Sequence, residues 1–300
     1  MRVMKNRERI HSLILVSTAL IWGVAFVAQR VGMDYVGAFT FGGVRFALGA
    51  ISLIPVALIF ERDTGDKAKR RRTFLSGAVC GLVLFFASSF QQFGIVVTGS
   101  AGRSGFITGL YIILVPIFGV FLGRRLTALQ WGGAAAALVG MYLLSVTDGF
   151  GSINFGDILL IICAVFWTLH ILIIDRYANN INSVRFSITQ FAVCSALSLI
   201  CAFATEDVTW AGIVAGKVPI LYGGLLSVGV AYTLQVVGQR GVKPEKAAII
   251  FSLESLFSVV GGAVLLGEQM TPRGYAGCAL IFAGIILSQL KPGDKSSSPV

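Results

Sequence analysis

Apolar residues occur along this chain in ten long runs that are separated by short polar links. The runs cover residues 11–29, 37–60, 74–97, 104–122, 129–146, 157–174, 184–204, 218–237, 247–266 and 274–290. A helix needs about 20 apolar residues to cross a hydrocarbon core of roughly 30 Å, and each run is close to that length. The runs are continuous, whereas the strands of a membrane barrel alternate between apolar and polar residues. The pattern therefore predicts an all-α integral membrane protein with ten transmembrane helices.

The runs of the first half recur in the second half at an offset of 144 or 145 residues. The corresponding pairs are Trp22 and Trp167, Phe46 and Phe191, Leu122 and Leu266, Thr127 and Thr271, Gly133 and Gly277, and Gly140 and Gly284. Similarity at a fixed period indicates a duplicated unit. We therefore predict two homologous units, residues 11–147 and 156–290, followed by a disordered cytoplasmic tail over residues 291–300.

Each predicted unit contains five helices, which is an odd number. The second unit must therefore enter the membrane from the side opposite to the first. Inverted copies of this kind are related by a pseudo-two-fold axis in the membrane plane, and in carriers they enclose a substrate site near the midplane. The sequence thus predicts two inverted five-helix repeats, an architecture typical of alternating-access carriers.

The composition agrees with a lipid environment. Hydrophobic residues make up 56% of the chain and charged residues 13%, which leaves too few polar side chains to cover a water-soluble globule of this size. The 36 glycines allow helix backbones to approach closely. The five cysteines all lie in apolar runs and form no Cys-x-x-Cys pair. We interpret them as small buried side chains and expect neither a metal site nor a cofactor.

Lysine and arginine gather in alternate links between the runs. If the N-terminus is cytoplasmic, 19 of the 24 fall in cytoplasmic segments, and the exceptions are Arg30, Arg45, Arg103, Lys217 and Arg273. Because positive residues mark the cytoplasmic side, we expect a multi-pass protein of the cytoplasmic membrane with both termini in the cytoplasm. The net charge of +10 then reports topology and does not indicate a nucleic-acid partner. The densest basic cluster, residues 67–72, lies in a short link between two runs.

Four short motifs occur in a characteristic order. They are Ile21-Trp22-Gly23, Val44-Arg45-Phe46, the segment over residues 101–111 that leads to Pro116, and Ser252-Leu253-Glu254 followed by Leu266-Gly267-Glu268. In this order the chain resembles the drug/metabolite transporter superfamily, EamA type, over nearly its full length. The resemblance implies ten helices in two inverted units that move small organic solutes across the cytoplasmic membrane.

Two positions differ from the pattern of that family. The Glu-Pro pair of the ninth helix is Glu254-Ser255 in this chain, so a backbone break at this point lacks its usual proline. The Gly-Glu pair that closes the fourth helix is Gly123-Arg124, which reverses a charge.

Glu254 and His170 are ionisable residues within predicted helices. Glu254 lies about ten residues into its run, roughly 15 Å deep, where a charge costs a few kcal/mol or more unless it meets water or a partner. It is either a site that binds a proton or a substrate amine, or an acid that joins helices through hydrogen bonds. His170 either relays protons or forms a neutral hydrogen bond to a neighbouring helix.

Two arginines raise similar alternatives. Arg45, within the second run, either binds an anionic substrate group such as a carboxylate or extends its side chain to the outer interface. Arg103 opens the fourth run on the outside and is a candidate external gate or interfacial anchor.

Aromatic and amide side chains complete the candidate substrate pathway. Trp22 and Trp167 are repeat-related and fall near mid-span, away from the interfacial belts where Trp is common, so they either line a shared cavity or pack between helices. Further hydrogen-bonding groups within the runs are Gln91, Gln92, Tyr111, Gln190, Tyr232 and Gln235; of these we select Gln92, Tyr111 and Gln235 as candidate pathway residues.

The sequence carries no pattern typical of an enzyme. It has no phosphate-binding Gly-x-x-x-x-Gly-Lys loop, no His-Glu-x-x-His pair and only two histidines, so we expect no catalytic residues. The favoured function is a secondary carrier that exports amino acids or related metabolites, with drug-like compounds as a further class and protons as the candidate coupling ion. The alternative is a passive channel or facilitator, and the sequence leaves a monomer and a homodimer equally open.

Overall fold

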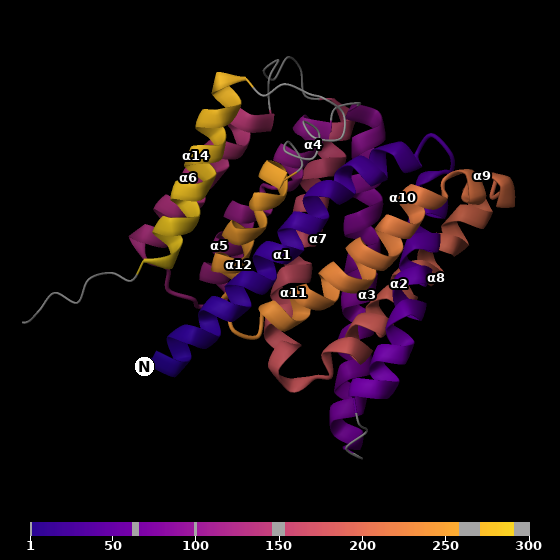
Figure 1. The fold of residues 1–300 in the computed structure, drawn as a ribbon, viewed down its shortest axis with the longest axis horizontal. Helices are drawn as coiled ribbons and strands as arrows, with labels where there is room; N and C mark the ends of the chain where they lie inside the picture. The colour runs from indigo at the N-terminus through magenta and orange to yellow at the C-terminus, as the bar shows by residue number, and fades with distance from the viewer. Residues whose placement is uncertain (1, 62–65, 99–100, 146–153, 258–270, 291–300) are drawn as a thin grey trace, which may run out of the picture.

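The computed structural model describes residues 2–61, 66–98, 101–145, 154–257 and 271–290, and within these ranges every regular element is a helix. The elements are α1 Arg2–Gly32, α2 Ala38–Phe60, α3 Lys67–Thr98, α4 Ala101–Thr108, α5 Tyr111–Phe121, α6 Ala128–Ser145, α7 Phe155–Tyr177, η1 Ala178–Asn180, α8 Ser183–Thr205, α9 Trp210–Ala215, α10 Lys217–Leu221, η2 Tyr222–Tyr232, α11 Thr233–Gly238, α12 Pro244–Phe251 and α14 Pro272–Gln289. Figure 1 shows them gathered into one helical bundle.

Seven of the described helical stretches are long and apolar enough to cross a membrane. They are Arg7–Gly32, Ala38–Phe60, Lys67–Thr98, Ser104–Phe121, Phe155–Asn180, Ser183–Thr205 and Lys217–Gly238. Two shorter apolar helices, Ala128–Leu144 and Pro272–Ser288, coincide with the fifth and tenth predicted runs. The ninth predicted run, residues 247–266, is described only to residue 257. The chain is therefore an all-helical multi-pass membrane protein, and the count of ten spans stays a prediction.

Helices α2 and α8 are packed together, and a carboxylate at the end of each helix caps the first turn of the other. Glu206, just after α8, accepts hydrogen bonds from the backbone N–H groups of Phe39 and Thr40 in the first turn of α2, at 2.7 and 2.8 Å. Gly37 precedes this turn, and any larger side chain there would occupy the space of the Glu206 carboxylate. The contact places a negative group at the positive end of the α2 dipole and satisfies two of its unpaired donors.

The same arrangement recurs at the other end of the helix pair. Glu61, just after α2, accepts hydrogen bonds from the backbone N–H groups of Val184 and Arg185 in the first turn of α8, at 2.9 and 3.2 Å. Glu61 and Glu206 are 145 positions apart, which is the offset of the sequence repeat. Each helix thus supplies the carboxylate that caps the other, so α2 and α8 run antiparallel.

Helices α6 and α14 form a second antiparallel pair at one edge of the bundle (Figure 1). Their backbones touch at four glycines: a Cβ atom on Gly133 would lie 2.6 Å from the carbonyl oxygen of Gly284, and one on Gly140 would lie 2.6 Å from that of Gly277. Gly133 and Gly140 are the repeat equivalents of Gly277 and Gly284. The two contacts are therefore copies of one another, and small residues allow them as expected within a membrane.

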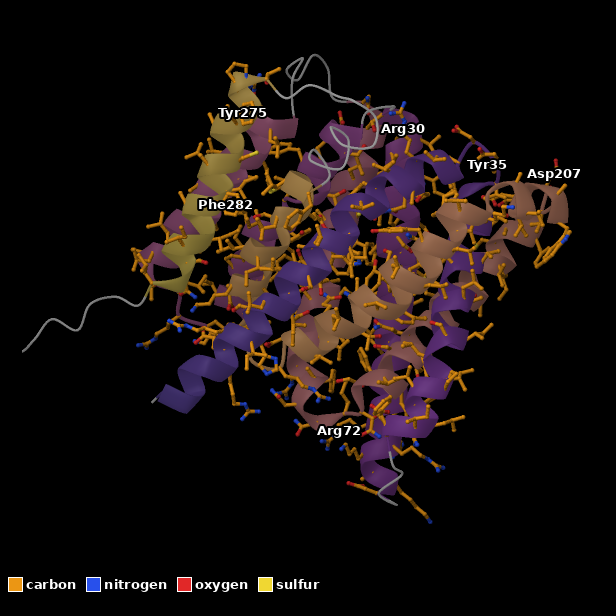
Figure 2. The ribbon with its side chains drawn as sticks, in the orientation of Figure 1. Arg30, Tyr35, Arg72, Asp207, Tyr275 and Phe282 are labelled. Carbon is orange, nitrogen blue, oxygen red and sulfur yellow. The ribbon has the colours of Figure 1, made fainter. Side chains whose placement is uncertain are left out.

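The remaining helices pack in matching sets. Helix α3 lies against α7 and α8, while the stretch α10, η2 and α11 lies against α1 and α2. Basic residues such as Arg72 stand at one end of the bundle, and Tyr35 and Asp207 stand at the other (Figure 2). We call the end with Arg72 the basic end.

Two of the helical stretches are interrupted in mid-bundle. Between α4 and α5, the backbone tightens at Gly109 and Leu110, where hydrogen bonds run from residue i to i−3 at 3.0 to 3.1 Å. The chain tightens in the same way at Ser252 after α12, at 3.2 to 3.3 Å. The break at Ser252 is present although Ser255 stands where the family has proline, so another cause than proline acts there. At the break, the hydroxyl of Ser252 donates to the carbonyl oxygen of Ile249 at 2.6 Å.

The reciprocal caps predict that neutralising one carboxylate weakens the bundle. Glu206→Gln should lower the free energy of unfolding by about 1–2 kcal/mol, because a neutral amide loses the charge-assisted bonds to the start of α2. Asp207→Asn removes the same charge from an exposed neighbouring residue and should change stability by less than about 0.5 kcal/mol. Denaturant unfolding in mixed micelles measures both, and equal effects of the two substitutions would contradict the capping role.

Candidate functional site

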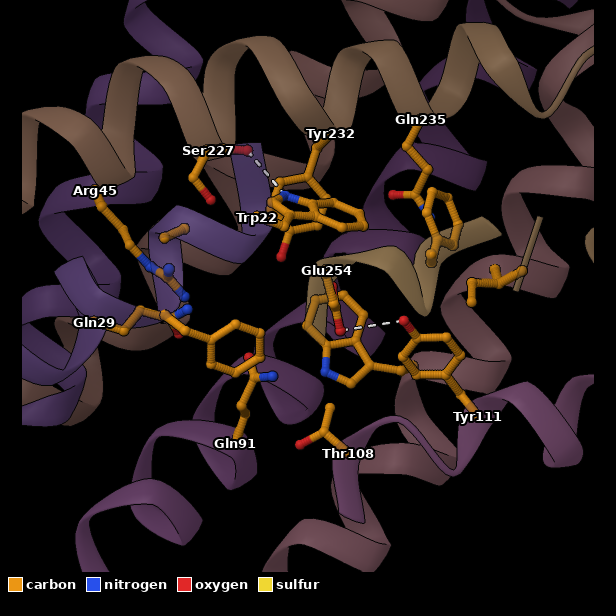
Figure 3. A pocket seen from close by; sticks show the side chains of 15 residues that line it. Trp22, Gln29, Arg45, Gln91, Thr108, Tyr111, Ser227, Tyr232, Gln235 and Glu254 are labelled. Carbon is orange, nitrogen blue, oxygen red and sulfur yellow. Dashed lines mark hydrogen bonds between the residues drawn. The ribbon is translucent and has the colours of Figure 1, made fainter. Parts of the chain in front are cut away.

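A cavity lies among the helices near the two interruptions (Figure 3). Fifteen side chains from both halves of the chain line it: Trp22, Ala25, Phe26, Gln29, Arg45, Gln91, Thr108, Tyr111, Trp167, Ile171, Ser227, Tyr232, Gln235, Phe251 and Glu254. Thr108 and Tyr111 flank the break between α4 and α5, and Phe251 and Glu254 flank the break at Ser252. The interruptions thus present these four side chains to a common space.

The cavity is small in this conformation. The centre of a water-sized sphere can move within a volume of about 40 Å³. A solute the size of an amino acid requires the surrounding helices to move apart.

Glu254 is the acid of the cavity and is 6% exposed. The hydroxyl of Tyr111 donates a hydrogen bond to its Oε1 atom at 3.2 Å, as Figure 3 shows. The two residues come from different halves of the chain, so this bond joins the halves across the cavity. The carboxyl has a second oxygen available to water or a ligand in the cavity.

Arg45 is the positively charged residue that lines the cavity, and it is 3% exposed. Its guanidinium carbon lies 5.3 Å from the centre of the Phe41 ring and 4.9 Å from that of Phe46. Within the described part of the chain, no hydrogen-bond acceptor contacts its buried Nε atom. The ring faces offset part of the cost of burying a cation, and water or an anion in the cavity must supply the rest. The side chain of Arg45 faces the cavity in Figure 3 and does not extend to the membrane interface.

An aromatic cluster forms the wall between Arg45 and Tyr111. Trp22 lies 6.4 Å from Trp167, 4.7 Å from Tyr232 and 5.4 Å from Phe251, measured between ring centres. The indole Nε1–H of Trp22 donates to the carbonyl oxygen of Ser227 at 3.3 Å. The cavity therefore offers a positive group, an acidic group and apolar ring faces within one enclosure.

The structure brings six of the predicted pathway residues together and places two elsewhere. Glu254, Trp22, Trp167, Arg45, Tyr111 and Gln235 line the cavity. His170 is buried behind Trp167, where its Nε2 atom lies 3.1 Å from Oε1 of Gln190. Gln92 is buried and donates to the carbonyl oxygen of Gln29 at 3.3 Å. The backbone of Arg103 lies in the first turn of α4, and its side chain lies outside the described residues.

Several lining residues were not among the candidates. Gln29, Thr108, Ser227 and Phe251 contact the cavity without having been selected from the sequence. Gln29 ends the first apolar run and Thr108 lies inside the motif of residues 101–111, so both carried a weak signal. Ser227 and Phe251 carried none, because serine and phenylalanine are common throughout the apolar runs.

At the basic end, Arg124 joins three segments of the chain. Its guanidinium contacts Oδ2 of Asp175 near the end of α7 at 2.5 Å and Oε1 of Glu245 in the first turn of α12 at 3.4 Å. The side chain of Glu245 is 1% exposed, so its charge depends on this partner. Partial burial works against the charged form of Arg124, but Asp175 and Glu245 outweigh it and raise the pKa of Arg124 above its ordinary value.

Comparison with known proteins identifies the family. The EamA-like transporter family matches residues 9–146 and again residues 154–290. The chain belongs to the EamA-like transporter family. A crystal structure of a protein 19% identical in sequence superposes with a TM-score of 0.78, covering 93% of this chain and 97% of the other, which shows a shared fold.

Three relatives illustrate the range of this EamA-like family. An uncharacterised transporter of Archaeoglobus fulgidus is 29% identical over 281 residues, covering 92% of this chain and 85% of the relative. The inner membrane transporter YedA of Escherichia coli is 22% identical over 275 residues, covering 90% and 88%. A probable terminal-alkyne amino-acid exporter of Streptantibioticus cattleyicolor is 25% identical over 308 residues, covering 95% and 94%.

The Arg124 contacts predict a coupled loss of stability in this EamA-like protein. Arg124→Gln should lower the free energy of unfolding by about 1–2 kcal/mol, since it leaves the buried Glu245 carboxylate without its cation. Adding Glu245→Gln should restore about half of the loss, which a double-mutant cycle detects.

Arg125 provides the matched control, because it is exposed and adjacent in sequence. Arg125→Gln should change stability by less than about 0.5 kcal/mol. Additive effects of Arg124→Gln and Glu245→Gln would show that the two side chains do not interact.

Proposed function

We propose that this protein is a secondary transporter that moves a small organic solute across the cytoplasmic membrane by alternating access. The solute is an amino acid or a related metabolite, with drug-like compounds as a further class, and the direction is export. The main support is that Arg45 and Glu254 face a common cavity lined by both halves of the chain.

The reciprocal contacts support two inverted units, residues 11–147 and 156–290. An antiparallel exchange between equivalent residues, such as Glu61 with Glu206, is what a two-fold axis perpendicular to the helices produces. The glycine contacts of α6 and α14 follow the same rule. A pseudo-two-fold axis in the membrane plane is the symmetry of carriers in which two halves rock around a fixed site. Ten spans and cytoplasmic termini complete this proposal, in agreement with the basic residues at one end.

The cavity chemistry supports a substrate that carries both charge and apolar surface. The Arg45 guanidinium suits a carboxylate, because it can donate two parallel hydrogen bonds. The Glu254 carboxyl suits an amine or a proton, and the rings of Trp22 and Trp167 suit an apolar or aromatic side chain. The relative described as a probable amino-acid exporter agrees with this class of solute.

The narrow cavity supports a carrier rather than a passive channel. Its free space of about 40 Å³ is small for an organic solute, so passage requires the helices to move. The contacts of Arg124 hold α7, α12 and the link before α6 together at the basic end, on one side of the cavity. Opening to that side requires these ion pairs to separate, which is the behaviour of a gated carrier.

Counterflow in proteoliposomes tests the proposal. Vesicles loaded with one amino acid should take up the same labelled amino acid against its gradient, and a panel of amino acids identifies the best substrate. Conductance that does not saturate, in the absence of counterflow, would instead show a channel.

Glu254 should govern the pH dependence of this exchange. Glu254→Gln should reduce net transport by about 30-fold or more, because loss of a buried charged group in direct contact with a ligand costs roughly 2–5 kcal/mol. The remaining transport should be independent of pH, and the amount of protein in the membrane should be unchanged.

Two variants sharpen that experiment. Tyr111→Phe keeps the acid and removes its hydrogen-bond donor, so it should alter the pH profile without abolishing transport. Asp207→Asn neutralises an exposed acid far from the cavity lining and should leave transport and its pH profile unchanged. A pH profile of Glu254→Gln identical to that of the unmodified protein would remove Glu254 from the coupling step.

A further inference from the structure

The first turns of α3 extend a basic segment beyond the apolar part of the helix. Residues 67–72 include five Lys and Arg residues. The side chains of Lys67, Arg71 and Arg72 are exposed, and no hydrogen bond or ion pair engages them within the described part of the chain. Over residues 66–72 these five cations stand against one carboxylate, that of Asp66, which accepts from the backbone N–H of Lys69. The segment therefore has a surplus of positive charge at the basic end.

A groove lies between this segment and the start of α8. It has a volume of about 580 Å³ and is lined by Lys67, Arg70, Arg71, Thr73, Phe74, Asn182, Arg185 and Thr189. We call it the α3–α8 groove. The backbone N–H of Asn182 donates to the hydroxyl of Thr73 at 3.2 Å, which fixes the link before α8 against α3. The groove is thus a built feature between two packed helices and not a gap between loose loops.

The lining changes from basic to apolar along α3. One face of α3 carries Lys67, Arg70, Arg71 and Phe74, which follow the spacing of a helix. The three cations therefore lie on the same face as the Phe74 ring, nearer to the start of the helix. Arg70 precedes Phe74 by four residues, about 6 Å along the axis. Phe74 is 60% exposed and Leu75 is 50% exposed, and the helix continues from them into its membrane-spanning part. A second groove on the adjacent face of α3 is lined by Arg71, Arg72, Leu75 and Val79 and shows the same change.

We propose that the α3–α8 groove binds an anionic phospholipid, with the phosphate held by Lys67 and Arg71 and an acyl chain lying against Phe74. Basic clusters that directly border a transmembrane helix attract anionic lipids with roughly 1 kcal/mol per residue. A soluble phosphate would use the cations but not the exposed apolar surface one turn below them. Arg185 contributes less positive charge than the others, because its Nε atom lies 3.7 Å from Oε2 of Glu61. The site is separate from the central cavity, so it does not depend on the identity of the transported solute.

Lipid titration of the purified full-length chain in detergent tests this proposal. A spin-labelled phosphatidylglycerol should bind more tightly than the matching phosphatidylcholine. The double variant K67Q/R71Q should weaken phosphatidylglycerol binding by about 30-fold at low salt, and raising the salt should shrink this difference. Binding of phosphatidylcholine should not change.

The matched control removes two charges elsewhere at the basic end. Arg7 and Arg9 are exposed on α1, and R7Q/R9Q should leave phosphatidylglycerol binding within about twofold of the unmodified chain. Equal losses in both double variants would show a general attraction to the basic surface and overturn the groove. Displacement of the lipid by millimolar inorganic phosphate would show a phosphate site instead and would also overturn the proposal. Circular dichroism and elution volume confirm that each variant is folded.

Discussion

Two ionisable groups buried among apolar helices set the main constraint on this structure. Arg45 and Glu254 are 3% and 6% exposed, and neither charge is tolerated in hydrocarbon without polar surroundings. The bundle meets this requirement by surrounding a small cavity with both residues, a tyrosine hydroxyl and several amides. Breaks in two helices deliver Tyr111 and Glu254 to that cavity. The interrupted backbone is acceptable there because it lies inside the protein.

The second organising principle is reciprocity between the halves. Glu61 follows α2 and caps α8, whereas Glu206 follows α8 and caps α2. In the same way, the glycines of α6 contact those of α14 in two equivalent pairs. These contacts tie the two halves of the chain together at both ends of the α2–α8 pair. Arg124 binds Asp175 and Glu245 at the basic end. Its repeat equivalent, Glu268, lies outside the described residues.

Hydropathy and the repeat offset predicted much of this arrangement from the sequence. The apolar runs mark the described helices within a few residues, and the offset identified Trp22 with Trp167, which face the same cavity. Polar residues inside apolar runs are costly to bury, which made four of the lining residues recognisable from the sequence: Arg45, Tyr111, Gln235 and Glu254. Their shared location depended on the fold and was not derivable from the runs alone.

The remaining features depend on helical phase and on tertiary contacts. Gln91 lines the cavity and Gln92 does not, although they are adjacent, because one position turns a helical side chain by about 100°. His170 was selected for its titration range, yet it packs behind Trp167 against Gln190. The caps by Glu61 and Glu206 join residues more than 120 positions apart, so no local pattern reveals them. The break at Ser252 was not predicted from the sequence, because the proline of the family is missing at Ser255.

Transport by alternating access requires the cavity to open in turn to each side of the membrane. The most direct test places one cysteine at Ser227 in a variant without the five native cysteines and labels it with a membrane-impermeant thiol reagent. We expect the reagent to label this cysteine in both right-side-out and inside-out vesicles. A transported solute should protect the cysteine from labelling in each. Labelling from one side only, unaffected by conditions that drive counterflow, would contradict alternating access.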